Sequence, residues 1–169
     1  MIKEDEVYKI GQIGRTHGVK GEVTFNFTDD VWDRADAEYL FLRVDGLLVP
    51  FFLEEYRFRS DTTALLKFLY YDSADDVQFM VGCDVLFPHA LTPEMSEDDE
   101  YTWQYFTGFS LIDRKAGLIG TIESVDDSTQ NVLFRVGERL IPAAKAWIKD
   151  ISHKERTIHM ELPEGLLEL

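Results

Sequence analysis

Short runs of alternating apolar and polar residues are the feature that most constrains how this chain can fold. In residues 22–27 the apolar Val23, Phe25 and Phe27 alternate with polar neighbours, which is the period of a half-buried β-strand. Similar β-rich runs are found at 7–13, 39–44, 48–56, 63–69 and 83–87. The first half of the chain therefore predicts a set of short strands joined by turns.

The strand pattern resumes in the second half. Runs at 117–125, 132–136 and 139–141 are separated by polar or glycine-containing turns. In residues 157–162 the apolar Ile158, Met160 and Leu162 share one face. Periodicity does not decide between strand and helical turn for residues 143–151. We expect a second small antiparallel β domain.

One segment favours a short helix. Ser73 is suited to cap it, Asp75 and Asp76 suit the positive end of its dipole, and Gly82 is suited to end it. Together with the strands, this predicts an all-β, mainly antiparallel fold with one or two short helices.

Residues 89–100 show neither helix nor strand periodicity and end in an acidic cluster. We therefore predict an amino-terminal domain over 1–92, a linker over 93–100 and a carboxyl-terminal domain over 101–169. With 169 residues, of which 45% are hydrophobic, the chain is large enough to form a core without disulfides.

The charge is strongly negative, with 17 Lys and Arg against 32 Asp and Glu and a formal net charge of −15. The excess of acidic residues is spread evenly along the chain. Residues 1–92 hold 17 acids and 9 bases, and residues 93–169 hold 15 acids and 8 bases. Such a chain is not expected to bind RNA or DNA through general phosphate attraction. Acidity favours a basic partner, although solubility alone would also explain it.

Several classes of chemistry find no support in the sequence. Cys83 is the only cysteine, so an intrachain disulfide is impossible, and the four histidines are far apart in the sequence. We predict no catalytic residue, no metal and no cofactor. The amino terminus lacks the pattern of a secretory signal and no run is long enough to span a membrane, so we expect a cytoplasmic protein; nothing requires more than a monomer.

The stretch GRTHGVKGEV gathers glycines and cationic side chains between two apolar runs. Its spacing matches neither a Walker A motif nor a dinucleotide fingerprint. Its glycines could simply form a turn between strands, with positive φ. Because its cations exceed what a turn needs, we also predict a contact loop for rRNA or the ribosome, formed by Gly14, Arg15, His17, Gly18, Lys20, Gly21 and Glu22.

The second candidate is YTWQYFTG, which begins at Tyr101. Tyr101, Trp103 and Tyr105 alternate, so in a strand they would share a face. They could belong to the core, form an exposed anchor for a protein partner, or stack on RNA bases. The acidic residues just before Tyr101 weaken the RNA alternative.

These two stretches and the ending LPEGLLEL, in this order, resemble the RimM family of ribosome maturation factors. The resemblance covers nearly the whole chain, although Thr102 and Thr16 stand where the family usually has an aromatic residue and a proline. It implies a six-stranded translation-factor-type barrel followed by a PRC-barrel. It also implies a non-enzymatic assembly factor that binds the immature 30S subunit and supports head maturation and 16S rRNA processing.

The partner implied by the resemblance is the nineteenth small-subunit ribosomal protein, contacted by Tyr101, Thr102, Trp103 and Tyr105 of the carboxyl domain. Two other functions stay open: an enzyme acting on a nucleotide or an RNA phosphodiester through His17 and nearby carboxylates, and an adaptor for another basic cytoplasmic protein.

Overall fold

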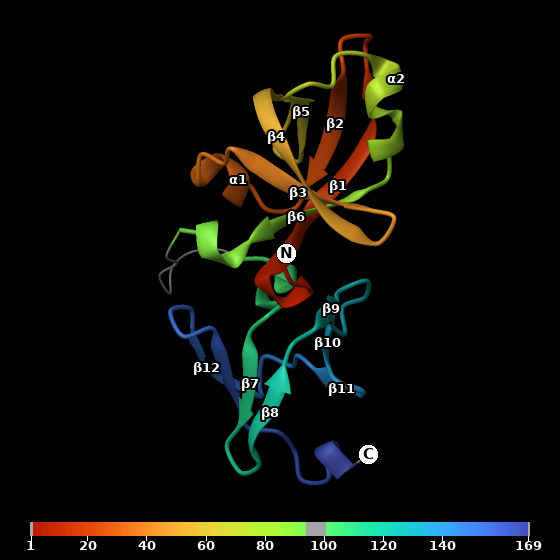
Figure 1. The fold of residues 1–169 in the computed structure, drawn as a ribbon. Coiled ribbons are helices and arrows are strands. Elements are labelled where there is room, and N and C mark those ends of the chain that lie inside the picture. The colour runs from red at the N-terminus through yellow and green to blue at the C-terminus, as the bar shows by residue number, and fades with distance from the viewer. Residues whose placement is uncertain (1, 94–100, 169) are drawn as a thin grey trace. The chain divides into compact units, whose positions relative to one another are not determined.

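The alternating runs of the first half pair edge to edge and close into a barrel. The computed structural model describes residues 2–93 and 101–168, and its first six strands follow the neighbour order β1-β2-β5-β4-β3-β6 (Figure 1). They are β1 (Val7–His17), β2 (Glu22–Phe27), β3 (Tyr39–Val44), β4 (Leu47–Phe58), β5 (Thr63–Phe68) and β6 (Asp84–Pro88). The six-stranded barrel predicted for the amino end is confirmed.

Strand β2 illustrates how the alternation builds the barrel. Its apolar residues Val23, Phe25 and Phe27 are buried, whereas Thr24 is only half-buried and Asn26 is exposed. Burying such side chains is the main driving force for closing the sheet. The two polar residues are left on the outer surface of the barrel, where they contribute to the candidate site described below.

Helix α1 (Val31–Arg34) buries the indole of Trp32 completely. This ring packs against four aromatic side chains of β2 and β4, at centroid distances of 4.5–5.9 Å: Phe25, Phe27, Tyr56 and Phe58. Packing of this kind stabilises a helix that is too short to form alone.

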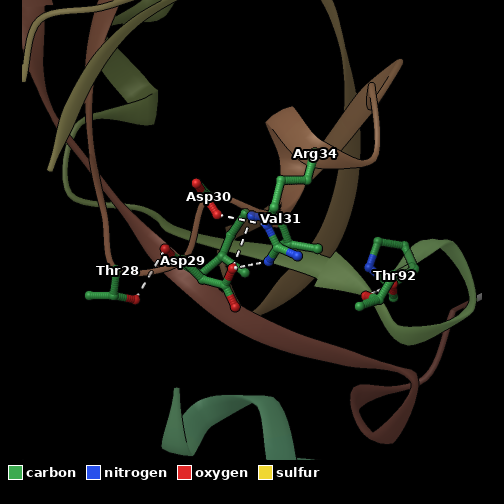
Figure 2. A network of polar contacts seen from close by, with 8 residues as sticks. Thr28, Asp29, Asp30, Val31, Arg34 and Thr92 are labelled. Atoms are coloured by element: carbon green, nitrogen blue, oxygen red, sulfur yellow. Dashed lines mark hydrogen bonds and ion pairs between the residues drawn. The ribbon is translucent and has the colours of Figure 1, made fainter. Parts of the chain in front are cut away.

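A polar network fixes the entry to α1 (Figure 2). A side-chain oxygen of Asp29 accepts the N–H of Val31 at 2.9 Å, and the guanidinium of Arg34 contacts Asp29 at 3.1 Å and Asp30 at 2.8 Å. The hydroxyl of Thr28 donates to the carbonyl of Ile10 at 3.2 Å. Burial raises the pKa of Asp29, and the bonds from Val31 and Arg34 oppose that rise.

Helix α2 (Ala74–Val77) begins as predicted but is shorter than predicted, because the chain continues from Gln78 as a 3-10 turn. The hydroxyl of Ser73 accepts the N–H of Asp76 at 3.2 Å, and Gly82 takes a φ of +84° after the 3-10 turn.

The 3-10 turns of the described residues are η1 (Glu4–Glu6), η2 (Gln78–Met80), η3 (His89–Leu91), η4 (Trp103–Phe106) and η5 (Leu166–Glu168). No described helix is long and apolar enough to cross a membrane.

Replacing Ser73 with Ala should lower the free energy of unfolding by about 1 kcal/mol, because the N–H of Asp76 loses its side-chain acceptor and keeps only the carbonyl of Ser73. Urea denaturation followed by circular dichroism measures this change. Ser73→Asp keeps an acceptor and should stay close to the wild-type value. Equal stability of the Ala variant and wild type would show that the cap contributes nothing.

The described residues divide into two compact units, one over 9–93 and the other combining residues up to Tyr8 with those after Pro93. Val7 and Tyr8 are buried, and the ring of Tyr8 meets that of Tyr105 edge-on, with centroids 5.4 Å apart. The amino end therefore contributes core side chains to the second unit. The predicted linker falls on residues 94–100, outside the described residues, apart from Pro93.

The second unit contains two sheets, with neighbour orders β12-β13-β7-β8 and β11-β10-β9. Figure 1 shows β7 and β8 side by side in the larger sheet. The strands are β7 (Ser110–Asp113), β8 (Gly117–Thr121), β9 (Ser124–Asp126), β10 (Leu133–Val136), β11 (Arg139–Pro142), β12 (Ile148–Ser152) and β13 (Thr157–Met160). A second small β domain is confirmed, although β13 pairs with β7 in parallel.

The prediction of one strand over 117–125 was wrong. The chain forms β8 in one sheet and β9 in the other, because Ile122 between them turns into the core and is fully buried. Burial of Ile158, Met160 and Leu162 on one face is confirmed. The undecided segment 143–151 forms a turn at 145–147 and then most of β12, which begins at Ile148.

A buried carboxylate joins the end of β7 to the carboxyl-terminal segment. Asp113 is 6% exposed and accepts the N–H groups of Lys115 at 3.1 Å, Ala116 at 2.9 Å and Leu162 at 2.9 Å. These backbone bonds lower its pKa against the opposing effect of burial.

Candidate functional site

The glycine-rich stretch forms the β1–β2 hairpin. Gly18 and Gly21 flank the turn with φ of +66° and +95°, as predicted for a glycine-shaped turn. Gly21 is also buried, and a Cβ there would lie 2.2 Å from the carbonyl oxygen of Tyr71. Glycine is therefore required at position 21 both by conformation and by space. Gly18 has open space around it, so only its φ favours glycine.

An irregularity in β1 sets the position of Arg15. The β1–β2 register shifts between Ile13 and Thr16, as in a β-bulge. The hydroxyl of Thr24 accepts the N–H of Arg15 at 2.8 Å and donates to its carbonyl at 3.2 Å. The backbone of Arg15 is thus held to β2 by a side chain where regular pairing is interrupted.

A hollow of about 550 Å³ lies on the outside of the barrel next to this irregularity. It is lined by Gly14, Arg15 and His17 of β1, Thr24 and Asn26 of β2, Arg59 just after β4, and Thr63 of β5. No carboxylate of residues 2–93 or 101–168 is among its lining residues. In a chain with 32 acidic residues, the hollow thus gathers two guanidinium groups and an imidazole with neutral polar groups.

Arg59 was missed by the sequence analysis. It lies just before the turn between β4 and β5, and its N–H donates to the carbonyl of Thr63 at 2.9 Å. Thr63 pairs with Asn26 of β2, which brings the turn beside the β1–β2 hairpin. This proximity depends on the strand order β1-β2-β5-β4, which the local sequence pattern does not contain.

The other residues of the predicted loop lie outside the hollow's lining. Lys20 is exposed on the turn, beside Val19, which is 77% exposed. Glu22 begins β2 and forms an ion pair with Arg57 at 3.3 Å. The predicted loop therefore separates into glycines that shape the turn, an exposed lysine, a paired glutamate, and the hollow with Gly14, Arg15 and His17.

The aromatic stretch is a 3-10 turn and not a strand. Tyr101 precedes η4 and is 41% exposed, Trp103 is half-buried against Phe106 and Phe134, and Tyr105 is only 5% exposed. The alternation therefore does not place the three rings on one face, and Tyr105 belongs to the core. The Thr102 hydroxyl is buried and has no hydrogen-bond partner in the described part of the chain.

His153 joins this cluster from the region after β12. Its ring lies 5.5 Å from that of Tyr101, and its Nδ1 is 3.2 Å from the hydroxyl of Tyr105. A shallow hollow of about 270 Å³ is lined by Tyr101, residues 148–151 and His153. Tyr101 is thus an exposed ring at the edge of a hollow, supported from behind by buried rings.

Within residues 2–93 and 101–168, no three His, Cys, Asp or Glu side chains gather in a way that could hold a metal ion. Cys83 is a free thiol whose pKa is raised by burial and by the neighbouring Asp84 and Asp45 carboxylates. A raised pKa disfavours the nucleophilic thiolate.

Comparison with known proteins gives a consistent result over both halves. The chain matches the RimM N-terminal domain over residues 8–92 and the RimM PRC barrel domain over residues 103–166. The ribosome maturation factor RimM of Phocaeicola vulgatus is 46% identical over 172 residues, covering 99% of this chain and all of that protein. RimM of Bacteroides thetaiotaomicron is 46% identical over 176 residues, covering all of this chain and 97% of that protein.

RimM of Parabacteroides distasonis is 39% identical over 173 residues, covering the whole of both proteins. The matched domains, the closed barrel and the two-sheet unit confirm the fold that the resemblance implied. The chain therefore belongs to the RimM family of ribosome maturation factors and has a role in ribosome assembly.

Proposed function

We propose that this chain assists assembly of the small ribosomal subunit by binding at two places without making or breaking covalent bonds. Its carboxyl-terminal domain binds the nineteenth small-subunit ribosomal protein, and the β1–β2 hairpin of its barrel contacts nearby 16S rRNA in the immature 30S particle. This binding supports maturation of the head and processing of 16S rRNA.

The observation that carries the proposal is the exposed ring of Tyr101 in a strongly acidic chain. Tyrosine offers a large contact area with few rotatable bonds, and here its neighbours Tyr105, Phe106 and His153 hold the ring in place. Ribosomal proteins are generally basic, so a net charge of −15 favours their approach and disfavours general contact with RNA.

The two contacts are proposed to reinforce each other. Once the carboxyl-terminal domain has bound, the hairpin reaches its RNA contact at an effective concentration in the millimolar range. A weak phosphate contact through Arg15, His17 and Lys20 then becomes sufficient. In this way an acidic protein binds RNA only where its protein partner marks the site.

Replacing Arg15 and Lys20 together with Ala should lower occupancy on precursor 30S particles by about tenfold, because both substitutions remove cations that face phosphate. Co-sedimentation measures occupancy, and calorimetry measures binding to the isolated ribosomal protein, which should not change. Loss of both activities would contradict separate roles. If the chain instead turns over a defined RNA and this activity depends on His17, the protein is an enzyme. If the chain captures another basic protein and no precursor particles, it is an adaptor.

A further inference from the structure

We infer that the hollow bounded by Arg15, His17 and Arg59 is a binding pocket for one phosphate group of an RNA backbone. The assignment of RNA as the source of the phosphate rests on the proposed function, whereas the pocket itself is argued from the structure. Arg59 is a residue of this pocket that the chain's sequence motifs do not indicate.

Unpaired charge is the first argument. Two other arginines of the barrel have carboxylate partners, since Arg57 pairs with Glu22 and Arg34 with Asp29 and Asp30. Arg15 and Arg59 have no ion pair with any carboxylate of the described residues, although acids outnumber bases almost two to one. Because both arginines line the same hollow and lack a carboxylate partner, binding of an oxyanion in the hollow is favoured.

The shape of the hollow is the second argument. A Cβ on Gly14 would lie 2.5 Å from the Thr24 hydroxyl oxygen and 2.9 Å from the Asn26 side-chain nitrogen. Both distances are shorter than van der Waals contact, so the Thr24 and Asn26 side chains already pack against the backbone of Gly14 and form one wall of the hollow with it. Both side chains are held in place, because the Thr24 hydroxyl is bonded to the backbone of Arg15 and the side-chain amide oxygen of Asn26 accepts from the Thr63 hydroxyl at 3.4 Å.

These groups match the needs of a phosphate diester. The arginines supply positive charge, the His17 imidazole and the Asn26 amide supply hydrogen-bonding groups, and no carboxylate of the described residues lines the hollow to oppose the anion. The nearby Asp61, two residues after Arg59, does not line the hollow. Its volume of about 550 Å³ is larger than a phosphate alone requires and leaves room for the attached ribose.

The test compares two arginines of the same strand region in the full-length protein. The ¹⁵N-labelled chain is titrated at low salt with an RNA pentanucleotide, and in a separate series with inorganic phosphate. We expect the pentanucleotide to shift the backbone amide signals of Gly14 and Thr24, to bind with a Kd of roughly 1 mM, and to be displaced by phosphate. Arg59→Ala should weaken this binding about fivefold or more, whereas Arg57→Ala should change it less than twofold.

Gly14→Ala provides a second variant, since its methyl group displaces the Thr24 hydroxyl and the Asn26 amide at the wall of the hollow and keeps every charge. It should weaken binding of the pentanucleotide about as much as Arg59→Ala does. Thermal unfolding checks that each variant is folded. Equal effects of Arg57→Ala and Arg59→Ala, or amide shifts caused by phosphate and not by RNA, would overturn the inference.

Co-sedimentation with precursor 30S particles separates this result from the proposed function. If the pocket does not bind RNA but the wild-type chain still associates with particles, the pocket assignment fails and the proposed function stands. If the pocket binds RNA but the chain does not associate with particles, the proposed function fails and the pocket stands.

Discussion

Replacing Asp113 with Ala should lower the free energy of unfolding by about 3 kcal/mol. The carboxylate is buried and accepts three backbone N–H groups, from Lys115, Ala116 and Leu162. Without it these three donors lose their acceptor, that of Leu162 in a buried position, and each such loss costs about 1 kcal/mol. Urea denaturation at neutral pH measures the change, and the exposed Asp127→Ala should stay within about 0.5 kcal/mol of wild type.

The same group predicts a dependence on pH. The pKa of Asp113 is lower in the folded chain than its ordinary value of 3.8, so its contribution is present in full above that value. The contribution is lost as the pH falls through the folded pKa. The stability difference between wild type and Asp113→Ala should therefore be constant from pH 7 to 5 and shrink below about pH 4. A constant difference down to pH 2 would contradict this assignment.

Replacing Tyr101 with Ala should weaken binding to the nineteenth small-subunit ribosomal protein by about 2 kcal/mol, or roughly 30-fold. The ring is exposed, yet contacts with Tyr105, Phe106 and His153 fix its orientation before binding. Little entropy is then lost on association. Isothermal titration calorimetry with the full-length chain measures the effect.

Leu118 provides a matched control for Tyr101. It is a large apolar residue of the same unit and is 70% exposed, so Leu118→Ala removes exposed apolar surface on β8. It should leave binding unchanged.

Replacing Tyr101 and Trp103 together should weaken binding further than Tyr101→Ala alone. Trp103 packs against Phe106 and Phe134, so its loss also destabilises the domain. Wild-type affinity in a folded Tyr101→Ala variant would remove the aromatic anchor from the proposed function.

Much of the fold could be predicted because its strands are short and half-buried. Alternation in β2 and β13 directly reports which side chains face the core, and Ser73 marks the start of α2 through a local hydrogen bond. Such signals lie within a few residues of one another. The closed barrel followed from the family resemblance, since alternation alone does not give the strand order.

The sequence was less informative where a side chain's environment depends on distant residues. Tyr101, Trp103 and Tyr105 alternate as in a strand, but the packing of Tyr105 against Tyr8 and Phe109 accompanies a 3-10 turn. Arg59 joins Arg15 only because β5 pairs with β2. Both features arise from tertiary contacts, which local periodicity does not contain.

The central claim is that an acidic member of this family binds a basic ribosomal protein through its carboxyl-terminal domain. Calorimetric titration of the full-length chain with the nineteenth small-subunit ribosomal protein, repeated at increasing salt, tests it most directly. The account predicts measurable association at low ionic strength that weakens as salt is added. Absence of association at low ionic strength, with both proteins folded, would contradict it.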